Sequence, residues 1–97
     1  MAQYIMVSKK LLERLRAAFK RYGSQVLGDP DITIDFFPTE FEEFFGVFLN
    51  SPNFQKMEYT ERQNSIWGYL SADPEITEDD IRYITQIATE AEEVEFV

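Results

Sequence analysis

Cysteine and histidine are both absent from the 97 residues of this chain. Without cysteine the chain can form neither a disulfide bond nor a thiolate metal site, and without histidine it has no imidazole for metal ligation or general-base catalysis. The sequence also lacks a glycine-rich phosphate loop and a G-x-S-x-G nucleophile motif. These absences remove most catalytic templates, so we predict a protein that is not an enzyme and needs no cofactor.

Long apolar segments are absent as well. The longest apolar run covers residues 44–49, whereas a membrane-spanning helix needs about 20 residues, and MAQYIMVSKK lacks the basic-then-apolar order of a signal peptide. The hydrophobic content of 44% is nevertheless sufficient for one small core. We therefore expect a soluble cytoplasmic protein that folds as a single domain over residues 1–97, without contact with a membrane.

Positive charge is scarce after the first quarter of the chain. The net charge is −9, but residues 1–22 hold six of the nine basic residues and one acid, for a net +5, while residues 23–97 carry a net −14. A nucleic-acid surface needs clustered Lys and Arg to neutralise phosphates. Only residues 1–22 could supply such a cluster, so the charge distribution disfavours nucleic-acid binding.

The residues between Ser8 and Gly23 predict the first helix. Ser8 is a typical N-cap, and Gly23 can end the helix in a left-handed conformation. The side opposite the apolar stripe carries Lys10, Arg14 and Arg21, which form either a solvated face or a phosphate-binding face. The stripe itself recurs at steps of three and four residues and consists of Leu11, Leu12, Leu15, Ala18, Phe19 and Tyr22.

A predicted strand and an ambiguous segment follow. Residues 31–37 alternate β-branched or aromatic residues with polar ones as far as Pro38, which is typical of a strand. Residues 39–49 fit a helical stripe with Thr39 and Glu42 as a capping box, and they equally fit the alternation of a strand. The local pattern alone favours the helix.

Residues 57–70 predict an amphipathic helix in which Gln63 lies in line with the apolar residues and Arg62 lies off their stripe. Arg62 can pair with Glu58 or face an acidic group on a partner. After an acidic loop at residues 71–80, residues 81–88 fit either a helix capped by Thr77 or a strand. The apolar stripe predicted to close the core consists of Tyr59, Ile66, Trp67 and Leu70.

Two sets of residues could imitate a functional site. Paired carboxylates in DPDITID, TEFEE and EITEDD lack the spacing of a calcium-binding loop, so solvated acidic loops are the better interpretation. An aromatic cluster could stack on nucleic-acid bases, but a small domain needs such residues for its core. This cluster consists of Phe36, Phe37, Phe41, Phe44, Phe45 and Phe48.

Taken together, several segments resemble the BolA family of small α+β proteins with a class II KH-like fold. LLERLRAAF resembles the first helix of that family, and FFGVFLNSPNF resembles its second strand, a serine turn and a following phenylalanine. The spacing continues to Arg62, Ile66, Trp67 and Leu70 in the helix-turn-helix-like segment. The resemblance implies the order helix-strand-strand-helix-strand with a small three-stranded mixed sheet, and it makes strands of residues 44–50 and 81–88.

The chain departs from this family where the family binds iron-sulfur clusters. Family members commonly supply a histidine near the last strand and share a cluster with a monothiol glutaredoxin. Here Arg82 stands at the late position and Gln63 stands where the family helix has a histidine. Since no His or Cys is present, the resemblance does not extend to cluster ligation.

The resulting hypothesis is a non-catalytic BolA-like module that binds or regulates a protein partner, such as a monothiol glutaredoxin-like protein. Its predicted contact residues are Arg62, Gln63 and Arg82, with no metal ligands. The alternative is a nucleic-acid-binding module of the transcription-regulator type that uses the helix-turn-helix-like segment. Against the alternative stand the acidic balance and the lack of a G-x-x-G loop.

Overall fold

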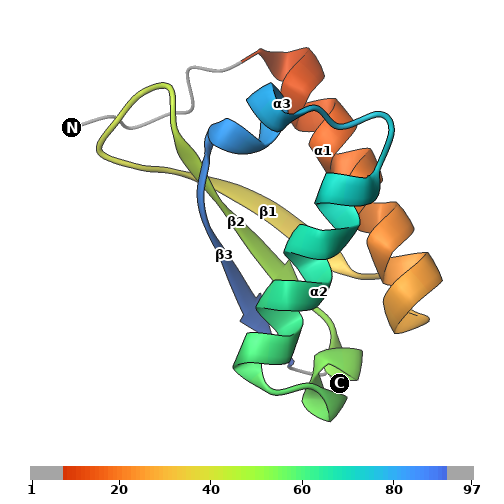
Figure 1. Cartoon of the computed structure of the whole chain (residues 1–97). Coiled ribbons are helices and arrows are strands. Elements are labelled where there is room, and N and C mark those ends of the chain that lie inside the picture. The colour runs from red at the N-terminus through yellow and green to blue at the C-terminus, as the bar shows by residue number, and fades with distance from the viewer. Residues whose placement is uncertain (1–7, 92–97) are drawn as a thin grey trace.

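The computed structural model describes residues 8–91, which form helices and a three-stranded sheet (Figure 1). Two α-helices account for most of the helical layer, and short π-helical, 3-10 and α-helical segments join them to the strands. In chain order the elements are α1 (Lys9–Tyr22), η1 (Gly23–Leu27), β1 (Thr33–Pro38), β2 (Phe45–Asn50), η2 (Pro52–Lys56), α2 (Tyr59–Ala72), α3 (Glu78–Arg82) and β3 (Ile84–Glu90).

The sheet has the order β1-β2-β3 and is mixed. β2 lies at its centre, antiparallel to β1 and parallel to β3. A parallel pair requires a crossover connection, and the segment from η2 through α3 supplies it. The α+β class and the small three-stranded mixed sheet predicted from the sequence are therefore confirmed, with the short helix α3 added before the last strand.

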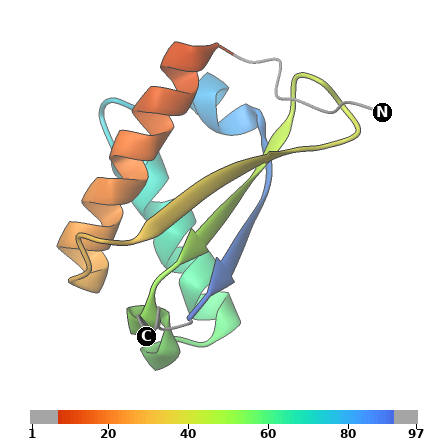
Figure 2. The same cartoon turned by 180° about the vertical axis from the view of Figure 1, so that it is seen from behind.

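One face of the sheet carries the core. Figures 1 and 2 show α1 and α2 together on the same side of the strands. Every second residue of β2 is fully buried beneath them, namely Phe45, Val47 and Leu49. The predicted apolar stripe of α1 packs here, with Leu11, Leu15, Ala18, Phe19 and Tyr22 all buried and Leu12 partly buried. The other face of the sheet has no helix over it in the described part of the chain.

The first helix, α1, ends at Tyr22 before Gly23 as predicted, but the predicted left-handed conformation of Gly23 is wrong. Gly23 has a right-handed conformation, the chain continues as η1, and Gly28 is the residue with positive φ, at 67°. Gly23 serves a different purpose, because a Cβ atom there would lie 2.7 Å from the carbonyl oxygen of Asp29 and 2.5 Å from Cγ2 of Ile32. A glycine is needed at position 23 for close approach rather than for a left-handed turn.

The two ambiguous segments are each divided between two structures. Residues 39–44 form a turn in which the Thr39 hydroxyl donates to the carbonyl oxygens of Phe41 and Phe44, and only Phe45–Asn50 is a strand. The helix favoured by the local pattern is therefore wrong at residues 39–49. At the other segment, Thr77 does cap a helix, but that helix ends at Arg82 and the strand begins at Ile84.

The helix predicted at residues 57–70 forms as α2 and is capped by Glu58 and Glu61. Ile66 and Leu70 are buried as expected, and Trp67 is half-buried against the core. Tyr59 is 67% exposed, so its predicted place in the core is wrong. It is the first residue of α2, where the helix extends past the end of the sheet (Figure 1).

Candidate functional site

The Arg62 side chain forms hydrogen bonds to other residues of the protein. Its Nε donates to the carbonyl oxygens of Phe54 and Met57, at 3.1 and 3.0 Å, and its Nη1 donates to the Thr89 hydroxyl at 3.3 Å. The guanidinium also lies 5.5 Å from the centre of the Phe54 ring. These contacts connect η2, the start of α2 and the end of β3. The geometry gives Arg62 a positioning role, and its predicted contact with a partner stays a prediction.

Gln63 connects α2 to the last strand. Its Nε2 donates to the carbonyl oxygen of Ile87 at 2.7 Å, and its Oε1 accepts from the indole N–H of Trp67 at 3.1 Å. β3 is an edge strand, and the carbonyl of Ile87 would otherwise be available to a further strand. Gln63 thus provides a hydrogen-bond acceptor for the Trp67 indole. It also occupies a backbone carbonyl group at the β3 edge of the sheet.

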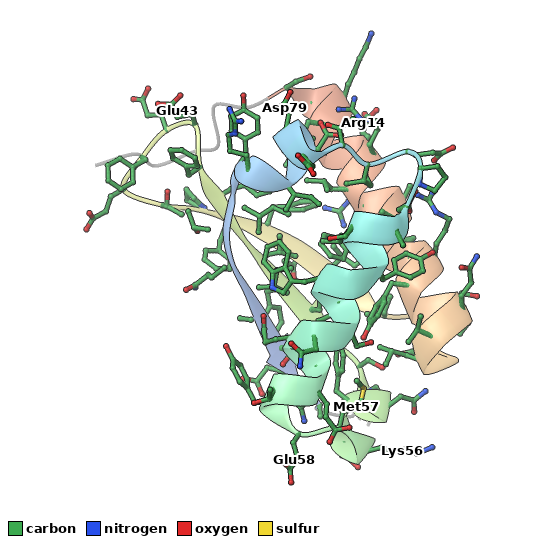
Figure 3. The ribbon with its side chains drawn as sticks, viewed as in Figure 1. Arg14, Glu43, Lys56, Met57, Glu58 and Asp79 are labelled. Atoms are coloured by element: carbon green, nitrogen blue, oxygen red, sulfur yellow. The ribbon has the colours of Figure 1, made fainter. Side chains whose placement is uncertain are left out.

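Arg82 lies at the opposite end of β3 from Arg62. It is the last residue of α3, where its side chain is 70% exposed and 3.4 Å from the Asp79 carboxylate. Figure 3 shows Asp79 at one end of the molecule and Met57 and Glu58, at the start of α2, at the other. Arg82 precedes the seven-residue strand whose far end contacts Arg62, and a strand of that length spans roughly 20 Å. Arg62 and Arg82, both predicted to contact the same partner, therefore lie at opposite ends of β3.

Two acids of the segment 71–80 are not solvated as predicted. Asp73 lies 2.7 Å from Arg21, and Asp80 lies 2.9 Å from Arg14, and both carboxylates are buried. Burial alone would raise the pKa of Asp73, but hydrogen bonds from Arg21 and a backbone N–H outweigh it and the pKa lies below its ordinary value.

The pKa of Asp80 is lowered in the same way. Burial again acts to raise it, and hydrogen bonds from the Thr77 backbone and from Arg14 more than compensate. The two arginines predicted to form a solvated or phosphate-binding face are therefore bound to carboxylates. Arg21 attaches α1 to the C-cap of α2 at Asp73, and Arg14 attaches α1 to Asp80 in α3.

Two surface hollows of about 420 and 450 Å³ adjoin these ion pairs. The first lies beside Arg21, Tyr69 and Glu75, and the second lies between Arg14, Glu43 and Asp79 (Figure 3). Each contains an arginine already paired with an acid. Among residues 8–91 no group of three or more His, Cys, Asp and Glu could hold a metal ion.

The uncovered face of the sheet is a feature that the sequence analysis missed. In its middle row, Asp35 on β1 lies next to Phe48 on β2, and Phe48 lies next to Ala88 on β3. In the neighbouring row the Phe37 ring covers Gly46, since a Cβ atom built there would overlap that ring. Phe37, Phe48 and Ala88 are half-buried although no helix covers them in the described chain. In Figure 2, which views the molecule from behind, the strands lie in front of α2, so their uncovered side is turned toward the viewer.

The predicted aromatic core is correct only in part. Phe45 is fully buried and Phe36 packs against the core, whereas Phe41 is 62% exposed on the β1–β2 turn. Phe37 and Phe48 point to the open face because strand side chains alternate. The alternation is visible in the sequence, but only strand pairing shows that two such residues share an uncovered face.

Charge is divided between the two layers. All nine Lys and Arg residues lie in helical segments, and none lies in a strand. The charged residues of the strands and of the β1–β2 turn are all acids, namely Asp35, Glu40, Glu42, Glu43 and Glu90. The side of the sheet that no described helix covers is therefore a small apolar patch with an acidic border. We call this side the open sheet face, defined by Asp35, Phe37, Phe48, Ala88 and Glu90.

Every helix within residues 8–91 is too short or too polar to cross a membrane.

Comparison with known proteins gives no relative from which a function could be transferred. No family model matches the chain, and no curated protein or solved structure matches it either. A function for this chain therefore has to be inferred from its own residues and geometry.

Proposed function

We propose that this protein is a non-catalytic, BolA-like protein-binding module that works without iron-sulfur ligation and uses its open sheet face. The observation that carries the proposal is the contrast between that face and the helix-covered side of the molecule. The central polar side chains there already have partners inside the protein, as Arg62, Gln63 and Asp73 illustrate. Phe37 and Phe48 instead keep part of their aromatic surface exposed on the side of the sheet that no described helix covers.

The BolA-like part of the proposal has two supports. One is the set of short segments that resemble the family, and the other is the element order with a mixed sheet, which that resemblance implies. Binding of a protein rather than a small molecule is favoured by the form of the surface. Neither of the two surface hollows is lined by a residue of the open sheet face, whereas small-molecule sites are concave.

Nucleic-acid binding is the weaker alternative. Three arginines of α1 are engaged within the protein, because Arg14 and Arg21 bind carboxylates and Arg16 donates to the carbonyl oxygen of Ile34 at 2.8 Å. These bonds engage three of the six basic side chains that the first helix could offer to phosphates.

Site-specific photo-crosslinking tests the proposal. A photoreactive phenylalanine analogue is placed at position 48 on the open sheet face and, as the matched control, at position 59 on the helical layer. Tyr59 is the more exposed of the two aromatic residues, so random collisions favour the control. We expect crosslinks to a defined protein from position 48 that are several-fold stronger than those from position 59, in extract of the cells that express the chain.

Equal crosslinking from both positions, or none from position 48, would contradict the use of the open sheet face. Crosslinks that join position 48 to nucleic acid would support the alternative instead. Circular dichroism of both variants checks that the analogue has not disturbed the fold.

A further inference from the structure

We infer that the open sheet face binds an extended polypeptide segment in which two basic side chains flank an apolar one. This inference rests on the proposed function and specifies the chemistry of the partner. It follows from three features of the face: its apolar centre, the position of its acids and the absence of any basic residue from the strands.

The centre of the face suits a single branched apolar side chain. The Phe37 ring covers Gly46, and Phe48 lies two residues further along β2, so the two rings are neighbours over the central strand. Phe48 also lies in register with the small side chain of Ala88. A side chain that packs against both rings would remove their remaining exposed surface from water.

The acids lie on opposite sides of this centre. Asp35 belongs to the row of Phe48 and Ala88, and Glu90 lies two residues beyond Ala88 on the other edge strand. Two strand spacings and two residues along a strand place the Cα atoms of Asp35 and Glu90 about 12 Å apart. Both side chains are exposed. In an extended peptide, side chains four positions apart are separated by about 13 Å and point the same way.

Charge also argues against a second copy of this chain as the occupant. Two copies stacked through the open sheet face would bring Asp35 and Glu90 of each against the same acids of the other. Each chain has a net charge of −9, and the strands supply no basic residue to offset this repulsion. A basic segment from another protein gains from the same field.

Nuclear magnetic resonance with a defined peptide tests the inference. The probe is the capped peptide Ser-Lys-Thr-Val-Thr-Lys-Ser, whose two Lys and central Val share one face when it is extended. The control peptide carries Glu in place of both Lys. We expect the probe to shift the amide signals of the β1 to β3 residues on the open sheet face at millimolar concentration, and we expect the control to leave them unchanged.

Variants of the protein separate this site from general attraction to an acidic chain. Asp35→Asn with Glu90→Gln should weaken binding of the probe about fivefold, the size expected for two exposed ion pairs. The control Glu13→Gln with Glu78→Gln removes the same charge from exposed positions on α1 and α3 and should leave binding unchanged. Phe48→Thr, which keeps a good strand former, should weaken binding at least tenfold while the remaining spectrum stays folded.

Several results would overturn the inference: equal weakening by both double variants, shifts confined to the helical layer, equal binding of the Glu peptide, or self-association through this face in sedimentation. If position 48 crosslinks a protein but the probe does not bind, the stated partner chemistry is wrong and the proposed function stands. If the crosslinked segment of that protein carries the basic-apolar-basic pattern, both are supported.

Discussion

The two faces of the sheet use the same strands in opposite ways. On the covered face, Val47 and Leu49 are fully buried beneath the helices, and the polar groups nearby are held by Arg62 and Gln63. On the open face, Phe37 and Phe48 are only half-buried, and the acids Asp35 and Glu90 border them. Since the valine, leucine, phenylalanines and acids of both faces come from the same three strands, the difference arises from which side α1 and α2 cover.

This difference separates residues that maintain the fold from residues that are available for binding. Arg62 and Gln63 were predicted to contact a partner, yet their hydrogen bonds are to Phe54, Met57, Thr89, Ile87 and Trp67. Asp35 and Glu90 on the open sheet face are exposed instead. Mutations on the two faces should therefore affect different measurements, stability in one case and binding in the other.

The largest expected effect comes from the phenylalanines of β2. Phe45→Ala removes a fully buried ring and should lower the free energy of unfolding by about 4 kcal/mol, because it leaves a cavity in the core. Phe48→Ala removes a ring that water already reaches and should cost about 1 to 2 kcal/mol. Urea denaturation of both variants measures the difference. Equal losses would show that the open face is as well packed as the core.

The glycines offer a second comparison between the two faces. Gly23→Ala places a methyl group against backbone at Asp29 and should cost about 3 kcal/mol, since the carbonyl oxygen cannot move independently. Gly46→Ala meets only the end of the Phe37 ring, which can swing toward solvent, and should cost about 1 kcal/mol. Thermal unfolding followed by circular dichroism ranks the two. A larger loss for Gly46→Ala would mean that Phe37 is fixed in place.

The two predicted site arginines should differ in the same way. Arg62→Gln removes hydrogen bonds to two backbone carbonyls and to Thr89, and it should lower the free energy of unfolding by about 2 kcal/mol. Arg82→Gln removes only an exposed contact with Asp79 and should change stability by less than about 0.5 kcal/mol. Chemical denaturation of both, side by side, would refute the positioning role of Arg62 if the two losses were similar.

The smallest expected effect is on how the stability of the protein changes at acidic pH. Because the pKa values of Asp73 and Asp80 are lowered in the folded state, the stability that they contribute is present above the ordinary Asp pKa of about 3.9. This stability is lost as the pH falls below that value, when the folded carboxyl groups take up protons. Asp73→Asn with Asp80→Asn should therefore give a shallower fall of stability between about pH 4 and pH 2.

Denaturation midpoints measured across that range test the prediction, and an unchanged slope would contradict the lowered pKa values. Arg14→Gln provides a comparison, because it keeps the Asp80 carboxylate and removes one of its donors. Its slope should lie between those of the wild type and the double variant.

Local patterns predicted the elements whose signals were strong and consistent. The apolar spacing of α1, its Ser8 cap, the alternation of β1 and the stripe of α2 were sufficient for those elements. The signals failed where two patterns overlapped, as at residues 39–49. There the phenylalanines recur at steps of three and four, while Phe45, Val47 and Leu49 alternate by two. There only pairing with β1 and β3 selects the strand.

Charge, the lack of His and Cys, and the positions of α1, β1 and α2 could be read from the sequence alone. Long-range packing was needed to show that Arg62 contacts Thr89, that Asp73 and Asp80 bind Arg21 and Arg14, and that Phe48 is only partly buried. The physical reason is that period and propensity act over a few neighbouring residues. The partner of an arginine or the cover of a phenylalanine comes instead from elements far away in the chain.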